Sequence, residues 1–126
     1  MEDSNYKMYI FVDVGLGMCK GKTAAQVGHA VQYMIDDIFT AHLNGVKRYK
    51  SVFEDYLIWK NHFGSAKIVL KATKEQLEEL KEMSYARHVI DAGKTQIEPG
   101  SLTVVAFFPM DCKKIRNDLS AFKLLN

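Results

Sequence analysis

An acid and two hydroxyl side chains occur together in the segment from Asp91 to Thr103, which reads DAGKTQIEPGSLT. Asp91 ends an expected strand, Thr95 lies in the following loop, and Thr103 opens the next strand. Acids at strand ends beside glycine-containing loops are common site positions in α/β proteins. The Thr95 and Thr103 hydroxyls would hydrogen-bond the carboxylate and fix its orientation, which makes Asp91 a candidate reacting group. The pattern fits equally well an Asx-type turn in which Asp91 caps its own backbone.

A second candidate is the turn GLGMCKGKT at residues 15–23, between an expected strand and an expected helix. Its ending, Gly21-Lys22-Thr23, fits a phosphate-binding loop, but the leading glycine of that motif would have to replace Leu16. We therefore reject nucleotide hydrolysis. The helix N-terminus, together with Lys20 and Lys22, still predicts an anion-binding site. The alternative is a tight turn with two solvated lysines.

Two further side chains near this turn have more than one interpretation. Cys19 would be a nucleophile if the helix N-terminus and the lysines lowered its pKa, but no feature places a base beside it, which favours an incidental residue. His29 fits a base or an RNA contact as well as it fits a half-buried structural histidine. No zinc site is expected, because the remaining histidines show no ligand spacing with the cysteines: His42, His62 and His88.

The charge balance permits a nucleic-acid partner without requiring one. The chain has 17 Lys and Arg against 15 Asp and Glu, a formal net charge of +2. Two basic runs, Lys47–Lys50 and Lys113–Arg116, would contact phosphates, although such runs are more often a solvated helix face.

The composition indicates one globular domain over residues 1–126, with a flexible polar tail at residues 1–5. With 48% hydrophobic residues, 8 Gly and 2 Pro, the chain is not collagen-like, low-complexity or disordered. No apolar run reaches bilayer length and the polar start has no apolar h-region, so neither a membrane span nor a secretory signal is expected. Two cysteines favour free thiols in a reducing cytosol.

Alternating strands and helices must position these groups. Expected strands cover residues 6–14, 66–72, 86–91 and 102–108; expected helices cover 21–43, 46–63 and 73–85, with one or two helical turns at 113–119. The connection at 92–101 is too short for a crossover helix, so we expect the strands beside it to be antiparallel or splayed. The result is an α/β domain with a small, mixed, about four-stranded sheet.

The first expected helix has two distinct faces. Its apolar stripe consists of Ala24, Val27, Gly28, Val31, Met34 or Ile35, and Ile38. A neighbouring, more polar face carries Lys22, Gln26, His29 and Tyr33.

Separated motifs of this chain resemble the type 2 peptidyl-tRNA hydrolase family. They are MCKGKTAAQVGHA at residues 18–30, DAGKTQI at 91–97 followed by PGSLT at 99–103, and the ending KLL at 123–125. They occur in the family's order over nearly the whole chain, with residues 36–63 the least diagnostic part. The resemblance implies a three-layer α/β/α domain, no metal or organic cofactor, and a possible homodimer.

The resemblance also implies a reaction and its residues. Family members cleave the ester between a peptide and the 3′ ribose of tRNA, so we expect peptidyl-tRNA as substrate, no membrane partner and a cytoplasmic location. The implied catalytic residues are Lys20, His29, Asp91, Thr95 and Thr103. The implied substrate-binding residues are Lys22, Gln26 and Gln96.

In the expected mechanism, Asp91 is oriented by Thr95 and Thr103, and it positions or deprotonates a water molecule. Lys20 stabilises the oxyanion or binds the terminal phosphate of the CCA end. His29 contacts the ribose or relays a proton.

Some positions depart from the family pattern and leave two further hypotheses open. Asp13 stands where the family usually has Arg, Gly15 where it has Asp, and Cys19 where it has Gly. These departures suggest an RNA-binding member with weakened or lost hydrolysis. A protein-interaction domain with a vestigial cleft is the third hypothesis.

Overall fold

A computed structural model describes residues 4–92, 97–98, 100–115 and 117–126. The strands are β1 (Tyr6–Asp13), β2 (Lys67–Ala72), β3 (Ala86–Ile90), β4 (Leu102–Phe107) and β5 (Met110–Asp111). The helices are α1 (Lys20–Leu43), α2 (Lys50–His62) and α3 (Lys74–Leu80). Short 3₁₀ turns cover Val14–Leu16, Lys47–Tyr49, Cys112–Lys114 and Asn117–Ala121.

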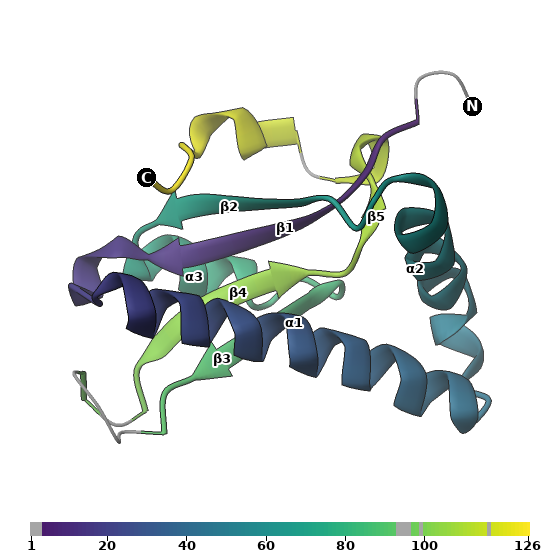
Figure 1. Cartoon of the computed structure of the whole chain (residues 1–126), viewed down its shortest axis with the longest axis horizontal. Coiled ribbons are helices and arrows are strands. Elements are labelled where there is room, and N and C mark those ends of the chain that lie inside the picture. The colour runs from purple at the N-terminus through teal and green to yellow at the C-terminus, as the bar shows by residue number, and fades with distance from the viewer. Residues whose placement is uncertain (1–3, 93–96, 99, 116) are drawn as a thin grey trace.

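The strands form a mixed sheet in the order β2-β1-β4-β3. β1 runs parallel to β2 and antiparallel to β4, and β3 is antiparallel to β4. The short β5 pairs with the start of β1, where Tyr6 lies opposite Asp111. Figure 1 shows α1 in front of the sheet and α3 behind it, which gives three layers. The predicted mixed α/β fold is confirmed, including the antiparallel strands on either side of the 92–101 connection.

The core lies around the two central strands. All six residues of β4 are buried, because helices cover both faces of this strand. Phe11 of β1 and Phe107 of β4 are each 0% exposed, and their ring centroids lie 4.9 Å apart. A continuous apolar run therefore marks each central strand, as the sequence indicated for β1.

The α1 helix buries a face that differs from the predicted stripe. Met34 and Ile38 are buried as expected, but Ala24 and Gly28 are exposed. The buried side chains are Gln26, Ala30, Met34, Ile38 and Ala41. The sequence placed Gln26 on the polar face, and the rotation of α1 puts it against the sheet.

Within the described ranges, no helix has the length and apolar character needed to cross a membrane.

The α3 helix begins as predicted and ends earlier. The Thr73 Oγ1 accepts from the Gln76 backbone N–H at 3.1 Å, and the Gln76 Oε1 accepts from the Thr73 N–H at 2.8 Å, which forms the expected capping box. The helix ends at Leu80 and not near residue 85, because short turn bonds follow. One of these runs from the Met83 N–H to the Leu80 carbonyl at 3.1 Å, and the turn redirects the chain into β3.

The C-terminal segment covers the outer edge of β2. The Lys71 N–H donates to the Lys123 carbonyl at 2.8 Å, and the Leu125 N–H donates to the Val69 carbonyl at 3.0 Å. Two backbone groups at this edge are thereby satisfied within the chain. The segment also brings the C-terminus toward the N-terminal end of α1 (Figure 1).

Candidate active site

A pocket of about 460 Å³ lies between the first four turns of α1 and the end of β3. Such a volume is typical of sites for small molecules or for one part of a larger substrate. It is lined by Cys19, Gly21, Lys22, Ala25, Gln26, His29, Tyr33, Ile90, Asp91 and Ala92. The polar face that the sequence predicted for α1 forms one wall of the pocket.

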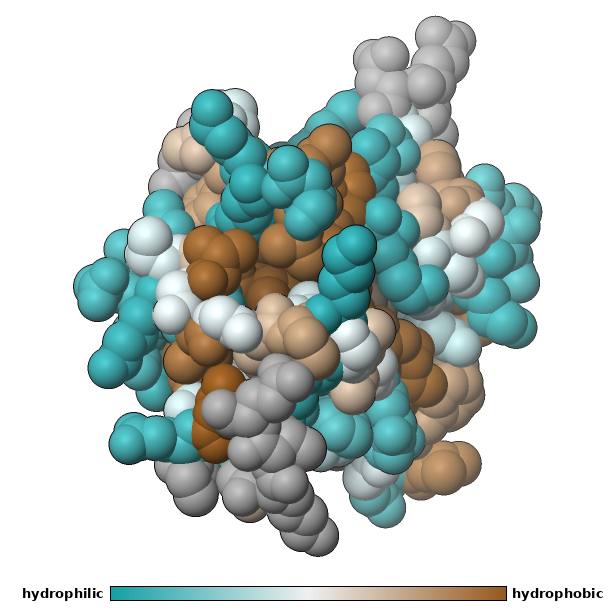
Figure 2. Space-filling view, turned by 60° about the vertical axis from the view of Figure 1, so that its left-hand side comes forward, coloured by the Kyte–Doolittle hydropathy of each residue, from teal (hydrophilic) through white to brown (hydrophobic). Residues whose placement is uncertain are grey.

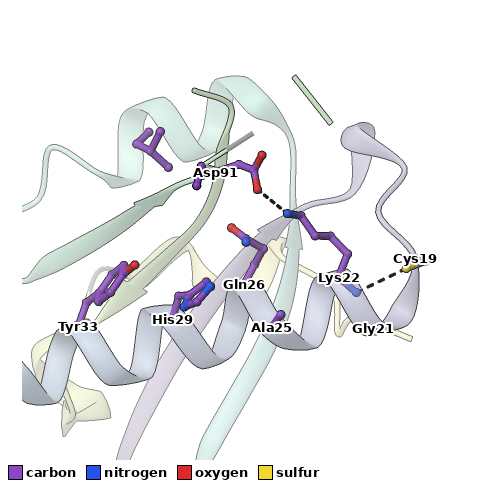
Figure 3. A pocket seen from close by; sticks show the side chains of 10 residues that line it. Cys19, Gly21, Lys22, Ala25, Gln26, His29, Tyr33 and Asp91 are labelled. Atoms are coloured by element: carbon purple, nitrogen blue, oxygen red, sulfur yellow. Dashed lines mark hydrogen bonds and ion pairs between the residues drawn. The ribbon is translucent and has the colours of Figure 1, made fainter. Parts of the chain in front are cut away.

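Lys22 and Asp91 form an ion pair at the polar end of the pocket. The Lys22 ammonium donates to Asp91 Oδ1, and these side chains are only 9% and 2% exposed (Figure 3). Two charges this well buried require each other, because an isolated buried charge costs several kcal/mol. The site therefore holds a cation and a carboxylate side by side.

Backbone hydrogen bonds hold Asp91 in place at the edge of the sheet. Its N–H donates to the Ser101 carbonyl at 2.9 Å, and its carbonyl accepts from the Gly100 N–H at 3.1 Å. Both partners precede β4, so the connection that leaves β3 returns beside Asp91. This arrangement fixes the backbone from which the carboxylate projects.

A buried polar pair supports the same wall. The Thr103 hydroxyl donates to Gln26 Oε1 at 2.6 Å and lies 3.3 Å from the Val89 carbonyl oxygen. Gln26 is 4% exposed and Thr103 is 0% exposed. A buried polar side chain needs such a partner, and the pair ties α1 to β4 next to Asp91.

The structure separates the two lysines of the helix N-terminus. Lys22 reaches Asp91, whereas Lys20 lines a second hollow with Met18, Val69 and Leu125. Side chains two positions apart on a helix point in directions that differ by about 200°. Figure 2 shows apolar atoms gathered between hydrophilic side chains on the face that carries the N-terminal end of α1. The Lys20 ammonium, which we expected beside Asp91, lines a different hollow, and Lys22 is the lysine in the pocket; the catalytic role of Lys20 stays a prediction.

The other predicted residues divide into three groups. His29 and Gln26 line the pocket as expected. Thr103 does not line the pocket, and its hydroxyl donates to the Gln26 amide oxygen that α1 places beside it and not to Asp91. Thr95 and Gln96 lie outside the described residues.

The positions that depart from the family pattern have local structural roles. Asp13 Oδ1 accepts from the Gly15 N–H at 2.8 Å, and a side chain at Gly15 would put its Cβ 3.2 Å from that oxygen. Asp13 lines hollows on the α3 side of the sheet and is absent from the walls of the Lys22–Asp91 pocket. Cys19 is the N-cap of α1, where its Sγ accepts from the Lys22 N–H at 3.5 Å.

Among the described residues, neither basic run lines this pocket. Lys47 and Lys50 line a hollow beyond the far end of α1, a helix about 36 Å long. Across the part of the chain that the structure describes, no group of three or more His, Cys, Asp or Glu side chains could hold a metal ion.

The Thr103–Gln26 hydrogen bond yields a stability prediction. In Thr103→Val, a methyl group replaces the hydroxyl and Gln26 Oε1 loses its donor inside the protein. We expect the free energy of unfolding to fall by about 1–3 kcal/mol, measured by urea denaturation. The double variant Thr103→Val with Gln26→Met should recover part of the loss, since it leaves no acceptor unsatisfied. An unchanged urea midpoint for Thr103→Val would show that this bond adds nothing to stability.

Comparison with known proteins identifies relatives over the whole fold. The sequence model of the family described as peptidyl-tRNA hydrolase PTH2 matches residues 6–125. The peptidyl-tRNA hydrolase of Sulfolobus acidocaldarius is 38% identical over 94% of this chain and 99% of its own length. That of Methanocaldococcus jannaschii is 34% identical over 94% and 99%. A probable peptidyl-tRNA hydrolase 2 of Schizosaccharomyces pombe is 37% identical over 98% of this chain and 58% of its own length.

Proposed function

The chain belongs to the peptidyl-tRNA hydrolase PTH2 family, and we propose that it hydrolyses the ester bond between peptide and tRNA in peptidyl-tRNA and so releases free tRNA. The observation that carries this proposal is the Lys22–Asp91 ion pair in the wall of the pocket. Ester hydrolysis needs a group that handles the proton of water and a group that receives negative charge on the carbonyl oxygen. A carboxylate beside an ammonium supplies both.

In the proposed reaction, Asp91 orients a water molecule and accepts its proton as the water oxygen attacks the ester carbonyl carbon. Lys22 stabilises the negative charge that develops on the carbonyl oxygen. When the tetrahedral intermediate collapses, the bond to the ribose oxygen breaks and that oxygen takes up the proton. The products are a peptide with a free carboxylate and tRNA with an intact 3′ ribose. No covalent enzyme intermediate is required, because the ester is already activated.

The remaining residues support this reaction at a greater distance from the carbonyl carbon. Thr103 and Gln26 brace the wall behind the ion pair and act as positioning residues. We assign the oxyanion role to Lys22, since its ammonium is the one beside Asp91, and we leave Lys20 as a candidate contact for a phosphate of the tRNA. Thr95 and Gln96 stay candidates on the basis of the sequence.

The reaction is tested with purified protein and N-acetylated aminoacyl-tRNA. We expect release of the acetylated amino acid, and much slower release from the same tRNA with a free amino group. Binding is measured in parallel by filter retention at several salt concentrations, because phosphate contacts weaken as salt rises. Salt-dependent binding without ester cleavage would support the RNA-binding hypothesis, and the absence of both would support the protein-interaction hypothesis.

We also propose that the protein acts in the cytoplasm and pairs as a homodimer. The supporting observation for a reducing compartment is that Cys19 and Cys112 do not form a disulfide with each other. The homodimer comes from the family resemblance alone, and sedimentation equilibrium of the purified chain tests it directly.

A further inference from the structure

Three side chains form a row at the end of the pocket opposite the ion pair. The rings of His29 and Tyr33, one helical turn apart on α1, are nearly parallel at 10°, with centroids 5.8 Å apart. The guanidinium carbon of Arg87, from β3, lies 5.1 Å from the centre of the Tyr33 ring. Both distances are in the range of stacking and cation–π contacts.

The order of this row follows from the helix. Arg87 Nε lies 3.2 Å from Asp37 Oδ2, although without hydrogen-bond geometry, and Asp37 is one turn beyond Tyr33. His29 is one turn before Tyr33, so the arginine and the histidine flank the tyrosine from opposite sides. Along the wall the order of the side chains is Arg87, Tyr33 and His29, and both His29 and Tyr33 line the pocket. His29 is the exposed end of the stack and faces the cavity in Figure 3.

The surroundings of His29 favour stacking over proton transfer. Among the described residues, no hydrogen bond or ion pair joins the imidazole to another side chain. The same pocket is also lined by Ile90, an edge-strand residue that is 47% exposed. A flat aromatic surface in a pocket with an apolar lining residue fits a planar, weakly polar group.

We propose that the His29 ring, backed by Tyr33 and Arg87, stacks on the nucleobase of the 3′-terminal nucleotide of the tRNA. This proposal rests on the proposed function. The reacting ester is attached to the ribose of that nucleotide, so the base attached to the same ribose must lie within one sugar of the Lys22–Asp91 pair. His29 and Tyr33 line the same pocket as this pair. His29 is then a binding residue and does not relay a proton.

The first test measures binding without turnover. Adenosine 5′-monophosphate and ribose 5-phosphate are titrated into the protein, and backbone amide shifts are followed by NMR. We expect the nucleotide to bind roughly 5- to 100-fold more tightly than the sugar phosphate, which is the usual range for stacking of one base. This preference should disappear in His29→Ala, persist in His29→Phe and shrink in Tyr33→Leu.

The second test separates stacking from proton transfer by kinetics. With N-acetylated aminoacyl-tRNA, His29→Ala should raise KM by roughly 5- to 100-fold with little change in kcat, whereas His29→Phe should restore KM. The control is His42→Ala, because His42 also stacks on a ring, that of Phe53 at 3.8 Å, but lies outside the pocket. That variant should match the wild type.

Three outcomes would overturn the proposal. The first is loss of kcat in both His29 variants, and the second is equal binding of the nucleotide and the sugar phosphate. The third is binding of N-acetylphenylalanine at this surface in place of the nucleotide, which would assign the surface to the peptide. If the wild type binds the nucleotide as described but cleaves no ester, the hydrolytic function fails and the stacking surface stands.

Discussion

We expect the Asp91→Asn variant to lose ester cleavage, with kcat for N-acetylated aminoacyl-tRNA about 10²- to 10⁴-fold below the wild type. Asparagine keeps the shape of the side chain but cannot accept the proton of the attacking water. KM should change little, because the tRNA contacts remain. Single-turnover release of the acetylated amino acid measures the chemical step directly.

The control for this prediction is a measurement that the Asp91→Asn variant is folded. Asp91→Asn leaves the Lys22 ammonium with an amide oxygen as acceptor, so its circular dichroism spectrum should match that of the wild type. Full turnover by a folded Asp91→Asn protein would exclude Asp91 as the general base.

The second large effect concerns Lys22. Lys22→Met should reduce kcat by about 10²- to 10³-fold, which is typical for loss of one oxyanion-stabilising group. It should also lower the free energy of unfolding by about 3–5 kcal/mol at pH 7, because it removes the ammonium from an ion pair whose two side chains are only 9% and 2% exposed. Urea denaturation and single-turnover kinetics measure the two effects separately.

The double variant Lys22→Met with Asp91→Asn separates stability from catalysis. It removes both charges, so stability should return toward the wild-type value while cleavage stays absent. Lys20→Met is the matched control, since it removes a lysine from the same helical turn but from a different hollow. It should raise KM at most and leave kcat within about tenfold. If Lys20→Met abolishes turnover and Lys22→Met does not, the assignment of the two lysines is reversed.

The same structure explains why the departures from the family pattern do not remove the Lys22–Asp91 ion pair. Asp13 and Gly15 satisfy each other within the turn after β1, and Cys19 caps the start of α1. None of these residues displaces Lys22 or Asp91 from the pocket. The hypothesis of lost hydrolysis therefore draws no support from the site geometry.

Several features followed from local sequence alone. The apolar run of β1 predicted a central strand, and the Thr73–Gln76 spacing predicted the cap of α3, because these patterns act over a few residues. The motifs at 18–30, 91–97 and 99–103 led to the family. The polar face with Lys22 and His29 was also visible in the sequence, although it did not show which lysine lies beside Asp91.

Only the tertiary structure decided how α1 is rotated about its axis. The sequence favoured a stripe through Ala24 and Gly28, whereas packing buries Ala30, Met34 and Ile38 and turns Gln26 inward. Gln26 tolerates this position because Thr103, 77 residues away, donates to it from β4. A partner at that separation leaves no trace in helical periodicity. The rotation aims Lys22 at Asp91 and turns Lys20 toward the C-terminus, because successive side chains of a helix point about 100° apart.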